Sequence, residues 1–150
     1  MKRVYFVLVL LLAPIVMAEE FPNQNQNSGF VGWQVGEEEK IGEYRISYPS
    51  TSDGEETNMA QNGPFAVVVF YCDEGEGFEQ YEWFQDATSL WGFITIVVED
   101  GTSFDAVEFM LQGWNNGSLS TVTGGQGMFA LNHIALGGHG TGAHYAAEVV

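Results

Sequence analysis

Apolar and polar residues form two kinds of pattern along this chain. Short runs rich in β-branched and aromatic residues predict strands, and segments with apolar residues three positions apart predict helices. The strands are predicted at residues 30–35, 42–48, 65–71, 93–98 and 133–136. The helices are predicted at residues 78–90, 103–114 and 141–150. Because strands and helices alternate, we expect an α/β fold with a mostly parallel sheet and helices on both of its faces.

The same patterns predict which side chains are buried. The apolar runs at 65–71, 93–98 and 133–136 are typical of buried strands, whereas the alternation at 42–48 predicts a half-exposed strand. The first helix is expected to bury Phe78, Tyr81, Phe84, Ala87 and Leu90. The second helix is expected to begin at the N-cap Ser103. Its buried stripe is expected to contain Ala106, Phe109, Met110 and Gly113.

The first eighteen residues have the parts of a secretory signal peptide. Lys2 and Arg3 precede an apolar run at 4–16, and Ala18 ends a Val-Met-Ala cleavage sequence. The alternative is a membrane anchor, but the run is shorter than the ~18–20 residues that span a bilayer, and Pro14 interrupts its end. We therefore expect residues 1–18 to be removed and the protein to be secreted, extracellular or periplasmic, without a stable membrane anchor.

The remaining chain has two parts and a strongly acidic composition. Residues 19–29 are polar, with repeated Asn and Gln, and predict a flexible leader, and residues 30–150 form the α/β part. The chain has 20 Asp and Glu against 4 Lys and Arg, a net charge of −16. So negative a surface repels nucleic acid, which excludes that class of partner. The single Cys excludes a disulfide scaffold.

A glycine-rich turn between an apolar strand and a helix is the clearest motif of the chain. Residues 134–144 read IALGGHGTGAH. The segment GHGTG within them resembles the nucleophile elbow of the α/β-hydrolases, G-x-S-x-G, in which side chains at the outer glycines would collide with neighbouring backbone. The five positions of this elbow are Gly138, His139, Gly140, Thr141 and Gly142.

The resemblance extends upstream, to secreted polyester hydrolases, cutinase-like enzymes and dienelactone hydrolases. Residues 45–49 resemble the second strand of that family, 63–70 the strand that leads to its oxyanion loop, and 79–81 the start of its first helix. Residues 91–100 resemble the next strand and its acidic end. The resemblance implies an α/β-hydrolase fold over roughly residues 31–150, with Cys72 at the end of a strand that lies beside the elbow strand.

The nucleophile position departs from the family. Gly140 stands where the resemblance implies a serine, and a glycine has no oxygen to acylate. Thr141 is an alternative nucleophile, although that frame would put His139 where a small residue is needed. Thr141 better matches the position whose backbone N–H helps to form the oxyanion hole.

The oxyanion loop departs from the family as well, because it contains Cys72 and Asp73 followed by further acids. An oxyanion hole stabilises developing negative charge, whereas two unit charges ~5 Å apart at an effective dielectric constant of ~20 repel by about 3 kcal/mol. Cys72 has two interpretations, a displaced nucleophile with a His base or a small buried residue that fills space. The acidic loop favours the second, since nearby negative charge raises a thiol pKa.

The chain stops ten residues after Gly140. In the family the acid and the His of the triad follow the elbow, so the sequence predicts a fold truncated after the elbow helix. It is then the N-terminal portion of a longer product or a genuinely shortened protein, with an exposed apolar edge at the elbow strand.

No cofactor or metal ion is expected from these patterns. Asp73, Glu74, Glu76 and Glu79 suggest a Ca²⁺ loop, but their spacing fits no EF-hand, and a solvated acidic loop is the alternative. His133, His139 and His144 lack the i, i+4 spacing of a helical zinc site.

Two functions remain open. The first is a secreted α/β-hydrolase-like protein without its catalytic serine, non-catalytic, which binds an ester, another small molecule or a partner through the old pocket. The second is a secreted carboxylic-ester hydrolase with a non-standard nucleophile, or one completed by residues beyond this chain. Gly140 and the acidic loop favour the first.

Overall fold

The computed structural model describes residues 26–33, 44–99, 102–119 and 122–149. The expected signal peptide and residues 19–25 of the expected leader lie outside these residues. The first strand, β1 (Ser28–Trp33), begins at Ser28, so Ser28 and Gly29 belong to the sheet and not to a flexible leader. Within the described residues, none of the helices is both long and apolar enough to cross a membrane.

The described residues form one six-stranded mixed sheet, in the order β3-β1-β2-β5-β4-β6. Its strands are β1, β2 (Tyr44–Pro49), β3 (Gly54–Glu55), β4 (Phe65–Tyr71), β5 (Phe93–Val98) and β6 (Phe129–Gly138). β5, β4 and β6 run parallel to one another, and β2 is antiparallel to both β1 and β5. This is an α/β fold, and its parallel strands end at the same edge of the sheet.

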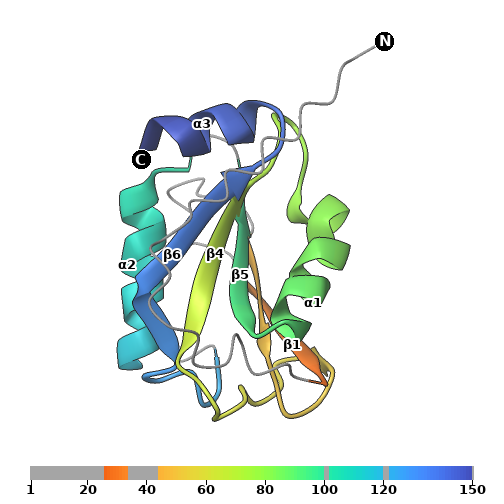
Figure 1. The fold of residues 1–150 in the computed structure, drawn as a ribbon, viewed down its shortest axis with the longest axis vertical. Coiled ribbons are helices and arrows are strands. Elements are labelled where there is room, and N and C mark those ends of the chain that lie inside the picture. The colour runs from red at the N-terminus through yellow and green to blue at the C-terminus, as the bar shows by residue number, and fades with distance from the viewer. Residues whose placement is uncertain (1–25, 34–43, 100–101, 120–121, 150) are drawn as a thin grey trace, which may run out of the picture.

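Helices cover both faces of the sheet, as the sequence predicts (Figure 1). The first predicted helix is a 3₁₀ turn, η1 (Phe78–Tyr81), followed by α1 (Glu82–Leu90) on one face. The other face carries α2 (Phe104–Asn116) and α3 (Thr141–Val149). The predicted N-cap is confirmed, because the Ser103 hydroxyl oxygen accepts a hydrogen bond from the N–H of Ala106.

The two faces of the sheet differ in polarity. The face under α2 is apolar, and the helix buries Val107, Met110, Leu111 and Trp114 against it. The face under α1 is more polar, because Arg45, Ser47 and Thr95 are buried there beside the apolar Phe70 and Val97. The predicted apolar stripe of this helix is confirmed only in part: Tyr81 is buried and Phe84 packs against Phe70 of β4, but Phe78, Ala87 and Leu90 are half-buried. The most buried residues of α1 are polar. Its fully buried positions are Gln85, Thr88 and Ser89, which hydrogen-bond across this interface or within the helix.

Three further expectations about burial are corrected. Phe109 of α2 is 72% exposed, because the helix turns its neighbours Val107 and Met110 toward the sheet. All six residues of β2 are buried, not half of them, since the strand lies inside the sheet between β1 and β5. β6 is longer than predicted and less buried. It lies at the end of the strand order, and His133 and Ala135 are exposed.

Candidate functional site

The predicted elbow is a tight turn between β6 and α3 at the edge where the parallel strands end. Gly140 has a φ of 55°, in the left-handed region that favours glycine. A Cβ on Gly138 would lie 2.5 Å from the backbone carbon of Gly142, and one on Gly142 would lie 2.2 Å from the carbonyl oxygen of Cys72. Backbone therefore crowds both outer positions, which is the steric reason for glycine that the motif suggests.

The loop after β4 places Asp73 directly against this turn. Oδ1 of Asp73 accepts hydrogen bonds from the Thr141 N–H at 2.8 Å and from the Thr141 hydroxyl at 3.1 Å. The N–H of Glu74 points to the same place and lies 3.0 Å from Asp73 Oδ1 and 2.9 Å from Thr141 Oγ1. The Thr141 N–H, and after it the Thr141 hydroxyl, hold the pKa of the Asp73 carboxyl below its usual range.

Asp73 also occupies the space next to the nucleophile position. A Cβ on Gly140 would lie 2.1 Å from Oδ1 of Asp73. A larger residue at position 140 therefore requires the Asp73 side chain to move. The sequence predicts that Asp73 acts on an oxyanion only by charge repulsion. In the structure the Asp73 carboxylate also accepts the hydrogen bonds of the N–H groups itself.

His139 is linked to the same loop through Glu76 and Tyr81. Nδ1 of His139 lies 3.5 Å from Oε2 of Glu76 and 3.0 Å from the Tyr81 hydroxyl, which donates a hydrogen bond to Glu76. Burial, followed by this bond to Glu76, raises the pKa of Tyr81. Sequence reasoning missed Tyr81 as a site residue, because its spacing matched an apolar stripe.

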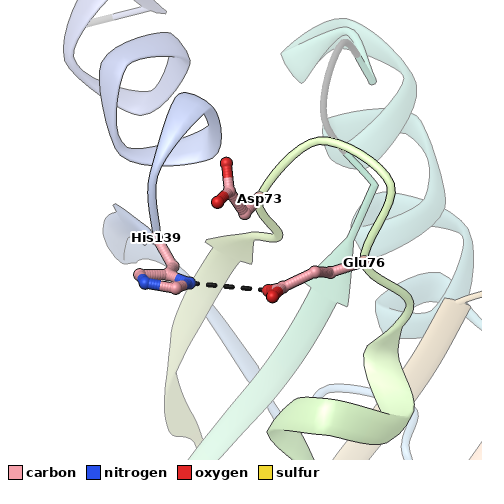
Figure 2. A group of neighbouring side chains, drawn as sticks. All are labelled: Asp73, Glu76 and His139. Carbon is pink, nitrogen blue, oxygen red and sulfur yellow. Dashed lines mark ion pairs between the residues drawn. The ribbon is translucent and has the colours of Figure 1, made fainter. Parts of the chain in front are cut away.

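Asp73, Glu76 and His139 together form a group of the kind that can hold a metal ion. One ligand atom from each of them lies within 4.8 Å of the others, and Figure 2 shows the dashed contact between Glu76 and His139, with Asp73 beside them. As a metal ligand, His139 was judged from the sequence only by its spacing to the other histidines. That spacing could not reveal a site whose ligands come from two loops.

Cys72 is placed beside the elbow as expected, but its side chain is buried. It lies at the end of β4 and packs with Tyr81 and Val97. Burial, and then the negative charges of Glu76, Glu99 and Glu79, raise the pKa of Cys72 to about 12. A thiol of this kind is not a nucleophile at neutral pH, so the structure favours the interpretation of Cys72 as a packing residue.

An acidic hollow opens next to the elbow. It has a volume of about 440 Å³. Its lining residues are Asp73, Glu74, Gly75, Glu76, Gly77 and Glu99. Four of these six residues carry carboxylates and the other two are glycines, so the hollow favours a cationic ligand over an anionic one.

The other two histidines of the chain lie apart from this cluster. His133 is an exposed residue of β6. His144 is on α3, where its Nε2 lies 3.2 Å from Glu148, one helical turn away on the surface. The chain matches no protein-family model and no curated protein.

Proposed function

We propose that this is a secreted protein with an α/β-hydrolase-type fold that binds a ligand and does not hydrolyse esters. The fold is supported by the turn between β6 and α3, by glycine at both outer elbow positions, and by the loop after β4 that meets this turn. Secretion is supported by the basic start, apolar run and small residues of positions 1–18.

The hydrogen bonds of Asp73 carry the non-catalytic part of the proposal. In the hydrolases that the elbow resembles, the N–H after the nucleophile and an N–H from the loop after a neighbouring strand bind the oxyanion. In this proposal the N–H groups of Thr141 and Glu74 correspond to these two donors. The Thr141 N–H donates to Oδ1 of Asp73, and the Glu74 N–H lies 3.0 Å from the same oxygen. An ester oxyanion would have to displace a carboxylate of the protein itself, and Gly140 offers no oxygen to form it.

One observation favours the second candidate function, a carboxylic-ester hydrolase with an unusual nucleophile. The Thr141 hydroxyl donates to the Asp73 carboxylate at 3.1 Å, and a carboxylate is a base that can accept a hydroxyl proton. Against it, the same carboxylate covers the N–H groups that a reacting carbonyl would need.

Ester hydrolysis distinguishes the two candidates. The purified protein is assayed with p-nitrophenyl acetate and butyrate in EDTA, beside Thr141→Ala, Gly140→Ser and the double variant Gly140→Ser/Asp73→Ala. We expect the unmodified protein to hydrolyse these esters no faster than Thr141→Ala does. We expect no hydrolysis by Gly140→Ser, because Asp73 fills the space that the new side chain would need.

A covalent probe gives the second readout. The unmodified protein is treated with a fluorophosphonate, which labels activated hydroxyl nucleophiles, and labelled peptides are mapped by mass spectrometry. We expect no label. Saturable ester turnover that is lost in Thr141→Ala, together with a label on Thr141, would overturn the proposal in favour of the hydrolase.

A further inference from the structure

Two carboxylates and one imidazole meet at the elbow from different parts of the chain. Asp73 and Glu76 come from the loop after β4, and His139 comes from the turn before α3, 63 residues beyond Glu76 in the sequence (Figure 2). We propose that these three side chains form a binding site for a divalent transition-metal ion, of which Zn²⁺ and Mn²⁺ are the test cases. The proposal concerns cation binding alone, so it holds or fails independently of ester hydrolysis.

The distances fit such an ion. Zn–N and Zn–O bonds of about 2.0–2.2 Å place two ligands of a tetrahedral ion roughly 3.4 Å apart. Nδ1 of His139 and Oε2 of Glu76 are 3.5 Å apart, and all three ligand atoms lie within 4.8 Å of one another. Closure onto an ion therefore needs movements of about 1 Å, which half-buried side chains can make.

The hydrogen bonds of Asp73 are compatible with this role. The bonds from Thr141 and Glu74 all go to Oδ1. They orient the carboxylate and leave Oδ2 available to a cation. The Tyr81 hydroxyl contacts the candidate ligand atoms themselves, Oε2 of Glu76 and Nδ1 of His139. It holds the two side chains close to each other without an ion, and an ion bound to Nδ1 would replace its contact with the imidazole. We assign Tyr81 the role of a positioning residue.

The charges around the cluster point to a cation as the ligand. Asp73 and Glu76 also line the hollow that contains Glu74 and Glu99. Arg45 is the only Lys or Arg among the described residues, and its guanidinium is bound to Glu82 and Asp86 on the α1 face. No Lys or Arg of the described part of the chain therefore balances the hollow, and a bound divalent ion would.

The ligand types select the class of ion. Ca²⁺ and Mg²⁺ prefer sites made of oxygen alone, whereas an imidazole favours first-row transition metals and zinc. We therefore expect Zn²⁺ to bind more tightly than Mn²⁺, and both to bind more tightly than Ca²⁺. Three protein ligands leave a fourth position for water or a small ligand.

Calorimetric titration of the purified, EDTA-stripped protein with ZnCl2, MnCl2 and CaCl2 tests the site. We expect one Zn²⁺ per chain and an affinity at least ~10-fold weaker in His139→Gln and in Glu76→Gln. Tyr81→Phe should weaken binding less than either. A melting curve of each variant without metal shows that it is folded. The low-temperature electron paramagnetic resonance spectrum of bound Mn²⁺ reports the change of ligands directly.

Two matched variants are the controls. His144→Gln removes an exposed histidine that also lies near a carboxylate, and Glu79→Gln removes an acid from the same segment as Glu76; both should bind like the unmodified protein. The proposal would be overturned by the absence of single-site binding. It would also be overturned by Zn²⁺ affinity that survives in His139→Gln and Glu76→Gln, or by Ca²⁺ binding as tight as Zn²⁺ binding, because either result indicates a diffuse acidic surface.

Discussion

At the scale of single residues, the carboxylate of Asp73 joins the loop after β4 to the turn between β6 and α3. It accepts hydrogen bonds from Thr141 and lies 3.0 Å from the N–H of Glu74, and it fills the space that a side chain at position 140 would need. Gly140 and Asp73 are thus matched to each other. A serine at 140 would clash with Asp73, and a smaller residue at 73 would leave the Thr141 N–H open, whereas the Glu74 N–H would keep its contact with Thr141 Oγ1.

Cys72 gives the first prediction at this scale. Its side chain is buried and its pKa is raised from 9.0 to about 12. The thiolate fraction at pH 8 is then about a thousandfold lower than for an ordinary thiol, and alkylation uses the thiolate. We expect iodoacetamide to modify the native protein at least a thousandfold more slowly than the guanidinium-unfolded protein. Equal rates would contradict the buried position of Cys72.

Gly142 gives the second prediction. A Cβ there would lie 2.2 Å and 2.4 Å from the carbonyl oxygens of Cys72 and Tyr71. Since backbone cannot yield as a flexible side chain can, Gly142→Ala should lower the free energy of unfolding by about 2–3 kcal/mol. Gly137→Ala is the control, because its Cβ would meet only Phe70 at 3.5 Å. Thermal or urea unfolding measures both, and equal stabilities of the two variants would contradict the close approach.

At the scale of elements, α1 shows why hydrophobic patterns predict burial imperfectly. Spacings of three suggested that Phe84, Ala87 and Leu90 face the sheet. Phe84 does pack on Phe70 of β4, but the strands beneath the rest of the helix present Arg45, Ser47 and Thr95. Gln85 donates a hydrogen bond to the Arg45 carbonyl oxygen, and the Thr88 and Thr95 hydroxyls are 2.6 Å apart. The polar side chains of α1 are hydrogen-bonded by polar groups of the strands beneath it. The pattern of the helix segment alone cannot show that these strands present polar groups.

The Arg45 contacts between β2 and α1 give the element-scale prediction. Arg45 is buried, pairs with Glu82 at 2.8 Å and Asp86 at 3.2 Å, and lies 4.1 Å from the centroid of the Phe30 ring. Arg45→Ala should lower the free energy of unfolding by about 2 kcal/mol, less than for a fully buried pair because both acids are half exposed. Arg45→Met retains the packing of the side chain and should lose less.

Glu82→Gln is the control for this prediction. Its side chain is 50% exposed, so removal of its charge should change the free energy of unfolding by less than about 1 kcal/mol. Urea unfolding measures all three variants. An Arg45→Ala variant as stable as the unmodified protein would show that these contacts do not hold α1 on the sheet.

The sequence predicted the elements better than the site. The runs at 65–71 and 93–98 match β4 and β5 to the residue, because continuous β-branched segments have few alternatives. The turn could be recognised from the sequence because close backbone contacts within and beside it require glycine at its outer positions. The contacts of His139 with Glu76 and Tyr81, and of Thr141 with Asp73, connect residues far apart in the chain. They depend on the alignment of β4 beside β6, which no local pattern specifies.

At the scale of the whole molecule, the charge of −16 sets how stability depends on salt. Excess negative charge repels itself in the compact state, and 1 M salt shortens the Debye length to ~3 Å from ~10 Å at 0.1 M. We expect the melting temperature at pH 7 to rise by several degrees between 0.05 M and 1 M NaCl. The same series near the isoelectric point of about 4.1 is the control, and there the rise should disappear. A rise of equal size at both pH values would contradict charge repulsion as its cause.

The central claim of this account is that the Asp73 carboxylate holds the backbone N–H groups of the elbow. Amide proton chemical shifts of the EDTA-treated protein test it directly, in the unmodified chain, in Asp73→Ala and in the control Asp105→Ala, an acid in the first turn of α2. Loss of a hydrogen bond to a carboxylate moves an amide proton upfield. We predict that the Thr141 signal moves upfield in Asp73→Ala and stays in place in Asp105→Ala. Glu74 is next to the substituted residue and its N–H also contacts Thr141 Oγ1, so its signal does not decide the test. A Thr141 signal that does not move when Asp73 is removed would contradict the claim, because Thr141 is 68 residues away in the chain and is linked to Asp73 through space.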